Sequence, residues 1–119
     1  MAEIKDMEAT DFGDVIKDSS KPVVVEFWVR SCSYCRKFKP VYEQLPGIFG
    51  DSVTFTKMNM LKSIENLRLA EGFGVEQTPT TKVFCGGDEV GEILGYVDLD
   101  EAVEKIKEII MSSPSCGAE

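Results

Sequence analysis

Two of the four cysteines, Cys32 and Cys35, are separated by two residues. Thiols at this spacing on a helix lie one turn apart, so they can form a disulfide or share a metal ion. The segment 23–29 has the β-branched and aromatic composition of a strand, and the pattern after it predicts a helix at about 33–48. Cys32 therefore lies at the start of a helix, where free backbone N–H groups and the helix dipole favour the reactive thiolate.

This placement predicts that Cys32 is a nucleophile and that Cys35 resolves the mixed disulfide formed on it. The alternatives are two small buried residues or half of a zinc site. A zinc site needs two more soft ligands, and only Cys85 and Cys116 remain because the chain has no histidine. We expect Cys85 to be a small buried residue at a strand end and Cys116 to be an accessory thiol on a mobile tail. Redox chemistry without a metal is therefore the favoured interpretation.

The elements that must position this pair alternate between strands and helices. Residues 23–29 are apolar on both faces apart from Glu26, which is typical of a central strand covered on both sides. The expected fold class is α/β, a central mixed β-sheet flanked by helices on both faces, with a domain at 1–111 and a flexible C-terminal tail at 112–119. The patterns predict strands at 2–8, 23–29, 53–60, 80–84 and 89–94, and helices at about 11–18, 33–48, 63–70 and 98–111.

Composition limits the possible partners. The 119 residues fit one domain, and 43% are hydrophobic, as in ordinary globular proteins. The net charge of −8 speaks against nucleic acid or an anionic membrane as the main partner. Charged residues throughout the first twenty positions predict a protein without a signal peptide, located in the cytoplasm. Residues 27–42 differ from this acidic background, because they contain four cations and no acid.

Further residues extend the pattern along the chain. Phe27-Trp28 precedes the cysteine pair, Pro40 lies inside the following helix, Thr78-Pro79-Thr80 precedes a strand, and Gly95 follows the last one. In this order, from about residue 3 to residue 110, these residues resemble the thioredoxin family. The resemblance implies a thioredoxin fold and an enzyme, a thiol–disulfide oxidoreductase. It also implies a cis peptide bond before Pro79 and, with no cofactor, a redox-active disulfide between the paired cysteines.

Glu26 is the unusual residue of its strand, because it shares a face with Val24 and Trp28. An isolated buried carboxylate is costly, so we expect Glu26 to be protonated or to pair with Lys57 of the strand at 53–60. The resemblance to the thioredoxin family implies that Glu26 occupies the position of a buried aspartate, which in the family exchanges a proton with the resolving thiol. An exposed carboxylate at a sheet edge and a structural ion pair are the alternatives.

A substrate strand is expected to bind beside the dithiol. A cis-proline at Pro79 would expose the backbone groups of Thr78 to a short β-augmentation. Trp28 either shields the dithiol or is simply a core aromatic residue, and Gly95 lies near the site in the family. Arg36, one turn into the helix, is expected to attract acidic peptides or the carboxylates of glutathione.

The sequence between the cysteines departs from typical thioredoxins. Ser31 replaces the usual tryptophan, and Ser33-Tyr34 replaces Gly-Pro. A Cys-x-Tyr-Cys motif is more similar to glutaredoxins, so the alternative function is a glutathione-dependent redox protein or an iron–sulfur cluster binding module. The favoured interpretation is a monomer that reduces or exchanges disulfides in protein substrates. A separate reductase or glutathione would restore its dithiol, because the chain has no nucleotide-binding glycine motif.

Overall fold

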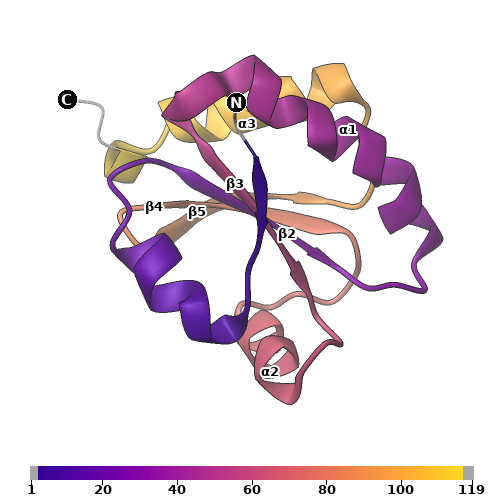
Figure 1. Ribbon diagram of the computed structural model, residues 1–119. Helices are drawn as coiled ribbons and strands as arrows, with labels where there is room; N and C mark the ends of the chain where they lie inside the picture. Colours follow the sequence, from indigo (N-terminus) through magenta and orange to yellow (C-terminus); the bar gives the residue numbers. More distant parts are fainter. Residues whose placement is uncertain (1–2, 117–119) are drawn as a thin grey trace.

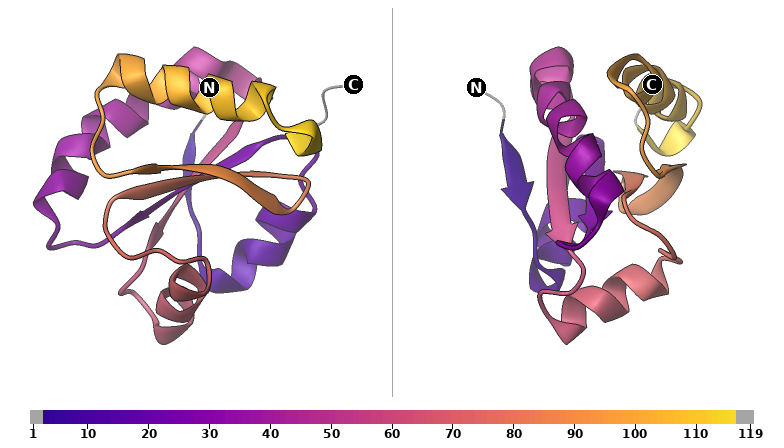
Figure 2. Two further views of the ribbon diagram at one scale, coloured as in Figure 1. Left: turned by 180° about the vertical axis from the view of Figure 1, so that it is seen from behind. Right: turned by 90° about the vertical axis from the view of Figure 1, so that its right-hand side faces the viewer.

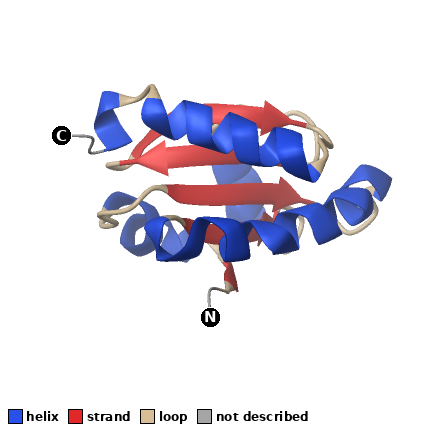
Figure 3. Ribbon diagram, turned by 90° about the horizontal axis from the view of Figure 1, so that it is seen from above, coloured by secondary structure: helices blue, strands red, loops and turns tan. Residues whose placement is uncertain are grey.

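One mixed sheet of five strands forms the centre of the protein, whose computed structural model describes residues 3–116. The strand order is β1-β3-β2-β4-β5, in which β1, β3 and β2 run parallel and β4 and β5 are antiparallel to their neighbours (Figures 1 and 3). This arrangement confirms the predicted mixed sheet. The strands are β1 (Ile4–Asp6), β2 (Val23–Trp28), β3 (Thr54–Asn59), β4 (Thr80–Cys85) and β5 (Asp88–Leu94).

Helices cover both faces of the sheet, as the sequence predicts. The long helices α1 (Ser33–Phe49) and α3 (Leu99–Met111) pack on one face, and α2 (Ile64–Gly72) covers the other (Figures 1 and 2). Within residues 3–116 no helix is both long enough and apolar enough to cross a membrane.

The central strand β2 separates two hydrophobic clusters. Val24 faces the cluster under α1 and α3, whereas Val23 and Val25 face the cluster on the α2 side. Because both faces are covered, the strand is buried from Val23 to Phe27. Because β2 is the middle strand, the segment between its carboxyl end and α1 lies at the centre of one edge of the sheet, where the strand ends meet.

The N-terminal region differs from the predicted helix at 11–18. The structure instead has a 3₁₀ turn at Ala9–Asp11 and a short π-helix at Gly13–Lys17. The backbone N–H of Ala9 donates to the side chain of Asn66 in α2, which ties this turn to a distant element. Tertiary contacts of this kind override the local α-helical pattern, and Ile16 of the π-helix is buried in the hydrophobic cluster on the α2 side.

The C-terminal segment also differs from the prediction. Residues Pro114–Cys116 form a helical turn, and Cys116 forms a disulfide with Cys85 at the end of β4. Cys85 is buried as expected, but the prediction of Cys116 as a free accessory thiol is wrong. Residues 117–119 of the predicted tail lie outside the described residues.

Candidate active site

The paired cysteines lie at the start of α1. Cys32 is the N-cap residue with an extended backbone, and the N–H of Cys35 donates to its sulfur over 3.0 Å. The structure joins the two sulfurs in a disulfide. Cys35 is only 5% exposed, whereas Cys32 is partly accessible. In the reduced protein the same backbone donor stabilises a thiolate on Cys32.

A loop before β4 approaches the accessible sulfur. The Thr78–Pro79 peptide bond is cis, as predicted, and the carbonyl oxygen of Thr78 lies 3.4 Å from Cys32 Sγ. Gly95 has a φ of +78°, a left-handed conformation that favours glycine. Its N–H donates to the carbonyl of Pro79 over 2.8 Å, which holds this loop against the end of β5. Thr78, Pro79 and Gly95 therefore lie together at the dithiol.

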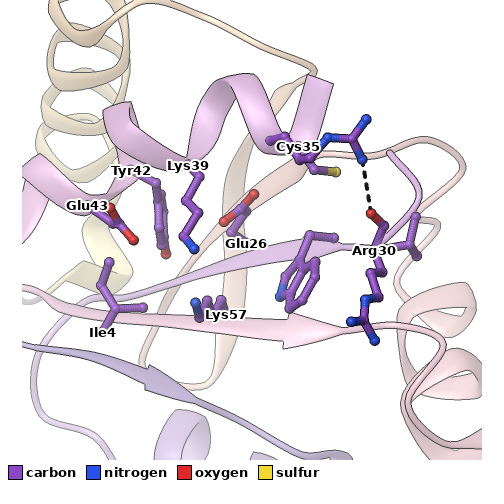
Figure 4. A pocket seen from close by; sticks show the side chains of 11 residues that line it. Ile4, Glu26, Arg30, Cys35, Lys39, Tyr42, Glu43 and Lys57 are labelled. Atoms are coloured by element: carbon purple, nitrogen blue, oxygen red, sulfur yellow. Dashed lines mark hydrogen bonds between the residues drawn. The ribbon is translucent and has the colours of Figure 1, made fainter. Parts of the chain in front are cut away.

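A cavity of about 200 Å³ extends from the buried sulfur between α1 and the sheet (Figure 4). Its polar and charged side chains come from two sides, α1 with the preceding loop and the sheet strands β2 and β3. The residues that line it are Ile4, Glu26, Trp28, Val29, Arg30, Cys35, Arg36, Lys39, Tyr42, Glu43 and Lys57. Four predicted site residues besides Cys35 thus share one cavity with it.

Glu26 is the titratable group inside this cavity. It is 5% exposed, so the alternative of a carboxylate exposed at a sheet edge is wrong. Burial raises its pKa to about 7, an effect that the charge of Lys57 opposes and that of Glu43 reinforces. In Figure 4 its carboxyl group points toward the α1 wall that carries Cys35. A group that is half protonated near neutral pH can accept and return a proton there.

Lys57 lies opposite Glu26 in the parallel register of β2 and β3, yet the two do not form an ion pair. Its described ion pair is with Asp6, at 3.9 Å, and its ammonium lies 5.8 Å from the centre of the Trp28 ring. Of the two expected states of Glu26, the structure therefore supports the protonated carboxyl group and not the ion pair with Lys57. The charge of Lys57 lowers the pKa of the Glu26 carboxyl group across the cavity, but burial raises it more, so the pKa stays near neutrality.

The cations near the motif separate into two sets. Arg36 donates to the backbone carbonyl of Arg30 over 3.2 Å, and both residues line the cavity with Lys39. Lys37 points elsewhere, because its ammonium lies 4.4 Å above the ring of Tyr96 in the segment after β5. Of the four predicted cations, Lys37 therefore makes a structural contact, and the other three line the cavity.

Glu43, which lines the cavity, and Thr81, which lies beside Glu26, were not singled out from the sequence, and Lys39 was considered only as one of four cations. Lys39 and Glu43 follow Cys35 at intervals of four, so helical spacing alone indicates that they share its face. Thr81 lies opposite Glu26 in the antiparallel register of β2 and β4, and its buried hydroxyl has no hydrogen-bond partner among residues 3–116. The position of Thr81 opposite Glu26 depends on strand register, which no local pattern in the sequence gives.

Comparisons with known proteins identify relatives over nearly the whole chain. The family model of Thioredoxin matches residues 3–108. A thioredoxin of Chlorobaculum thiosulfatiphilum is 34% identical over 89% of this chain and 97% of its own length. The chloroplastic M-type thioredoxin of Chlamydomonas reinhardtii is 31% identical over 83% of this chain and 69% of its own. The protein disulfide-isomerase tigA of Aspergillus niger is 33% identical over 90% of this chain, which spans only 30% of that longer protein.

Solved structures agree with the sequence relatives. The short form of thioredoxin F from spinach chloroplast matches with a TM-score of 0.80 at 28% identity, over 91% of this chain and 94% of that one. These relatives do not favour the glutaredoxin-like alternative. Among residues 3–116 there is no group of three or more histidine, cysteine or acidic side chains placed to hold a metal ion. The paired cysteines and the relatives make this protein a thiol–disulfide oxidoreductase, and the chain belongs to the thioredoxin family.

Proposed function

We propose that the protein reduces disulfides in protein substrates by passing two electrons from the Cys32–Cys35 dithiol. One observation carries the proposal. Cys32 is accessible at a helix N-terminus, where the Cys35 N–H donates to its sulfur over 3.0 Å. This environment stabilises a thiolate that substrates can reach.

In the first step the Cys32 thiolate attacks one sulfur of the substrate disulfide. A bond forms between Cys32 and that sulfur, and the other substrate sulfur leaves as a thiolate that takes a proton from water. The backbone of Thr78, beside the attacking sulfur, offers hydrogen bonds to an extended substrate segment.

In the second step Cys35 gives its proton to the Glu26 carboxylate and attacks Cys32 Sγ. The Cys32–Cys35 disulfide forms, and the second substrate sulfur leaves and takes up a proton. Glu26 suits this role because it borders the same cavity as Cys35 and has a pKa of about 7. The substrate has then gained two electrons, and the protein has lost two.

The finer predictions complete the proposal. A separate reductase or glutathione restores the dithiol, no other cofactor takes part, and the protein works as a monomer. Binding of nucleic acid or membranes is not expected, given the net charge of −8. The cytoplasmic location stays a prediction, since the similar proteins include chloroplastic thioredoxins.

The test is reduction of a disulfide-bonded protein such as insulin, with dithiothreitol as electron source. Cys32→Ser should lower the rate to that of dithiothreitol alone. Cys35→Ser should accumulate a covalent adduct between Cys32 and the substrate, visible by mass spectrometry and released by reductant. Cys116→Ser is the matched control and should keep the wild-type rate. An adduct on any other cysteine, or a Cys32→Ser variant of normal rate, would show that the proposal is wrong.

A further inference from the structure

Charge is distributed very unevenly around the dithiol. Residues 27–42 carry four cations and no acid, while the rest of the chain has nine basic and 21 acidic residues, a net charge of −12. Three of these cations, Arg30, Arg36 and Lys39, border the cavity beside Cys35. We call these three residues the cationic rim.

The cationic rim is held in place without any acidic partner. The guanidinium of Arg36 donates to the Arg30 carbonyl, which joins the loop after β2 to the first turn of α1 (dashed line in Figure 4). None of the three side chains has an ion pair within the part of the chain that the structure describes, although acids outnumber bases in the sequence. All three are exposed, so their charges are available to another molecule.

The carboxyl groups near the rim do not cancel its charge. Glu26 and Glu43 border the same cavity, and Lys57 adds a fourth cation to its wall. Because the pKa of Glu26 is about 7, this group is only partly ionised at neutral pH. The cavity and its border therefore keep a net positive charge on an otherwise acidic protein.

We propose that the cationic rim binds an acidic segment that flanks the disulfide of a protein substrate. This inference rests on the proposed function and names the substrate class that the site prefers. Arg36 follows Cys32 by four residues, about one helical turn or ~6 Å along the helix axis. An extended substrate covers that distance in about two residues, so acids two to four positions from the attacked cysteine reach the rim.

A protein segment fits this surface better than a free anion does. Tyr34, between the two cysteines, is 59% exposed and offers an aromatic contact next to the charges. Aromatic side chains and arginines are the groups that dominate protein–protein interfaces. The negative charge of the remaining surface repels acidic molecules elsewhere, so an acidic partner is directed to the dithiol end.

The test compares three disulfide peptides that differ only in the residues flanking the cysteine, which are Glu, Gln or Lys. The reduced protein should react with the Glu peptide about tenfold faster than with the Gln peptide at low salt, and slowest with the Lys peptide. The preference should shrink at about 300 mM salt, because exposed charges are then screened.

Two variants with equal charge changes locate the effect. Arg30→Gln with Lys39→Gln should bring the Glu and Gln rates together. Lys17→Gln with Lys107→Gln removes two exposed cations from other elements and should keep the preference. Equal rates for all three peptides in the wild type would overturn the acidic preference and leave the proposed function standing. No reduction of any peptide would instead refute the proposed function. Faster, rim-dependent reduction of oxidised glutathione than of the Glu peptide would overturn the assignment to a protein segment.

Discussion

The two disulfides lie at opposite ends of the sheet and have different surroundings. Cys32–Cys35 follows the carboxyl end of β2, with one sulfur accessible. Cys85–Cys116 lies at the carboxyl end of β4, which runs antiparallel to β2. Cys85 is 2% exposed and belongs to the hydrophobic cluster under α1 and α3. Cys116 is partly accessible, as Cys32 is, but it packs against that cluster, whereas Cys32 lies at a helix N-terminus beside the backbone of Thr78.

Two buried charged residues of the sheet, Lys82 and Glu26, also have different surroundings, although they lie only one register position apart in the β2–β4 pair. Lys82 is 2% exposed in β4, and its ammonium lies 2.6 Å from Glu89 and 2.7 Å from Glu92. A register shift in the β4–β5 pair places both acids on the same face of the hairpin. Desolvation lowers the pKa of Lys82, but the two hydrogen-bonded carboxylates outweigh it, so the pKa is raised.

Glu26 has no such partner, and its pKa falls near neutrality. The sheet therefore contains one buried charge that is neutralised and stays fixed, and another, one register position away, that titrates in the working range. The comparison indicates that the Cys32–Cys35 pair can react because Cys32 is accessible at a helix N-terminus and a titrating carboxyl group borders the same cavity as Cys35.

The largest expected difference concerns stability. In a Cys32→Ser/Cys35→Ser background, adding Cys116→Ala should lower the free energy of unfolding by about 3–4 kcal/mol, from loss of a cross-link over 31 positions. Urea unfolding with and without dithiothreitol measures it. The two proteins should become alike in reductant, and Ser113→Ala is the control. An equal difference in reductant would mean that side-chain packing, not the cross-link, stabilises the fold.

The pH dependence of Glu26 comes next. Between about pH 4.5 and 7 the folded protein binds more protons than the unfolded chain, so its stability falls as the pH rises. Above pH 7 the loss should reach about 3 kcal/mol and stay constant. Glu26→Gln should remove this slope, increase stability near pH 8 and slow disulfide reduction. Glu104→Gln, an exposed carboxylate on α3, should change none of these, whereas an unaltered slope in Glu26→Gln would contradict the assigned pKa.

Redox titration should separate the two disulfides. Ser33-Tyr34 in place of Gly-Pro and the charge of Arg36 favour the reduced pair, which gives an expected potential of about −190 to −250 mV. Structural disulfides lie below about −300 mV, so the gap is about 50 mV or more, ~2 kcal/mol. Equilibration with thiol buffers, followed by Trp28 fluorescence and by counting alkylated cysteines, measures both. A single transition in which all four thiols appear together would show that the two disulfides have the same reduction potential, contrary to this prediction.

The smallest effect is expected where α3 meets β5. A Cβ atom on Gly91 would lie 2.7 Å from the side chain of Ile109, so in Gly91→Ala either this side chain or the helix that carries it must shift. We expect a loss of about 1–3 kcal/mol without loss of disulfide reduction. Gly47→Ala in α1 meets nothing within 4 Å and should stabilise the protein by about 0.5–1 kcal/mol. Thermal unfolding measures the stability of both variants, and the insulin assay measures their activity. A fall in the activity of Gly91→Ala at a temperature where it is fully folded would show that the α3–β5 contact affects the active site.

The sequence was most informative where local patterns decide the structure. The apolar run of β2, followed directly by a helix with Cys32 at its start, needs only neighbouring residues, and the structure has this arrangement. The cis peptide before Pro79 was available only through the family resemblance, since most such bonds are trans.

The features that were missed depend on contacts between distant residues. Thr81 lies opposite Glu26 only because of the register of β2 and β4. Cys116 finds Cys85 because α3 folds back over the sheet. The turn at Ala9 follows the side chain of Asn66 in α2 rather than its own helical pattern. Periodicity describes one element at a time, so it cannot supply such pairings.

The disulfide between Cys85 and Cys116 also closes a covalent ring that contains β5 and α3. A protease that cuts the backbone once inside this ring produces two new ends but no separate fragment. The nicked protein therefore stays one molecule, with α3 still attached beside the sheet, until a reductant opens the bond. A single cut inside the ring therefore cannot release the C-terminal helix unless a reductant also opens the disulfide.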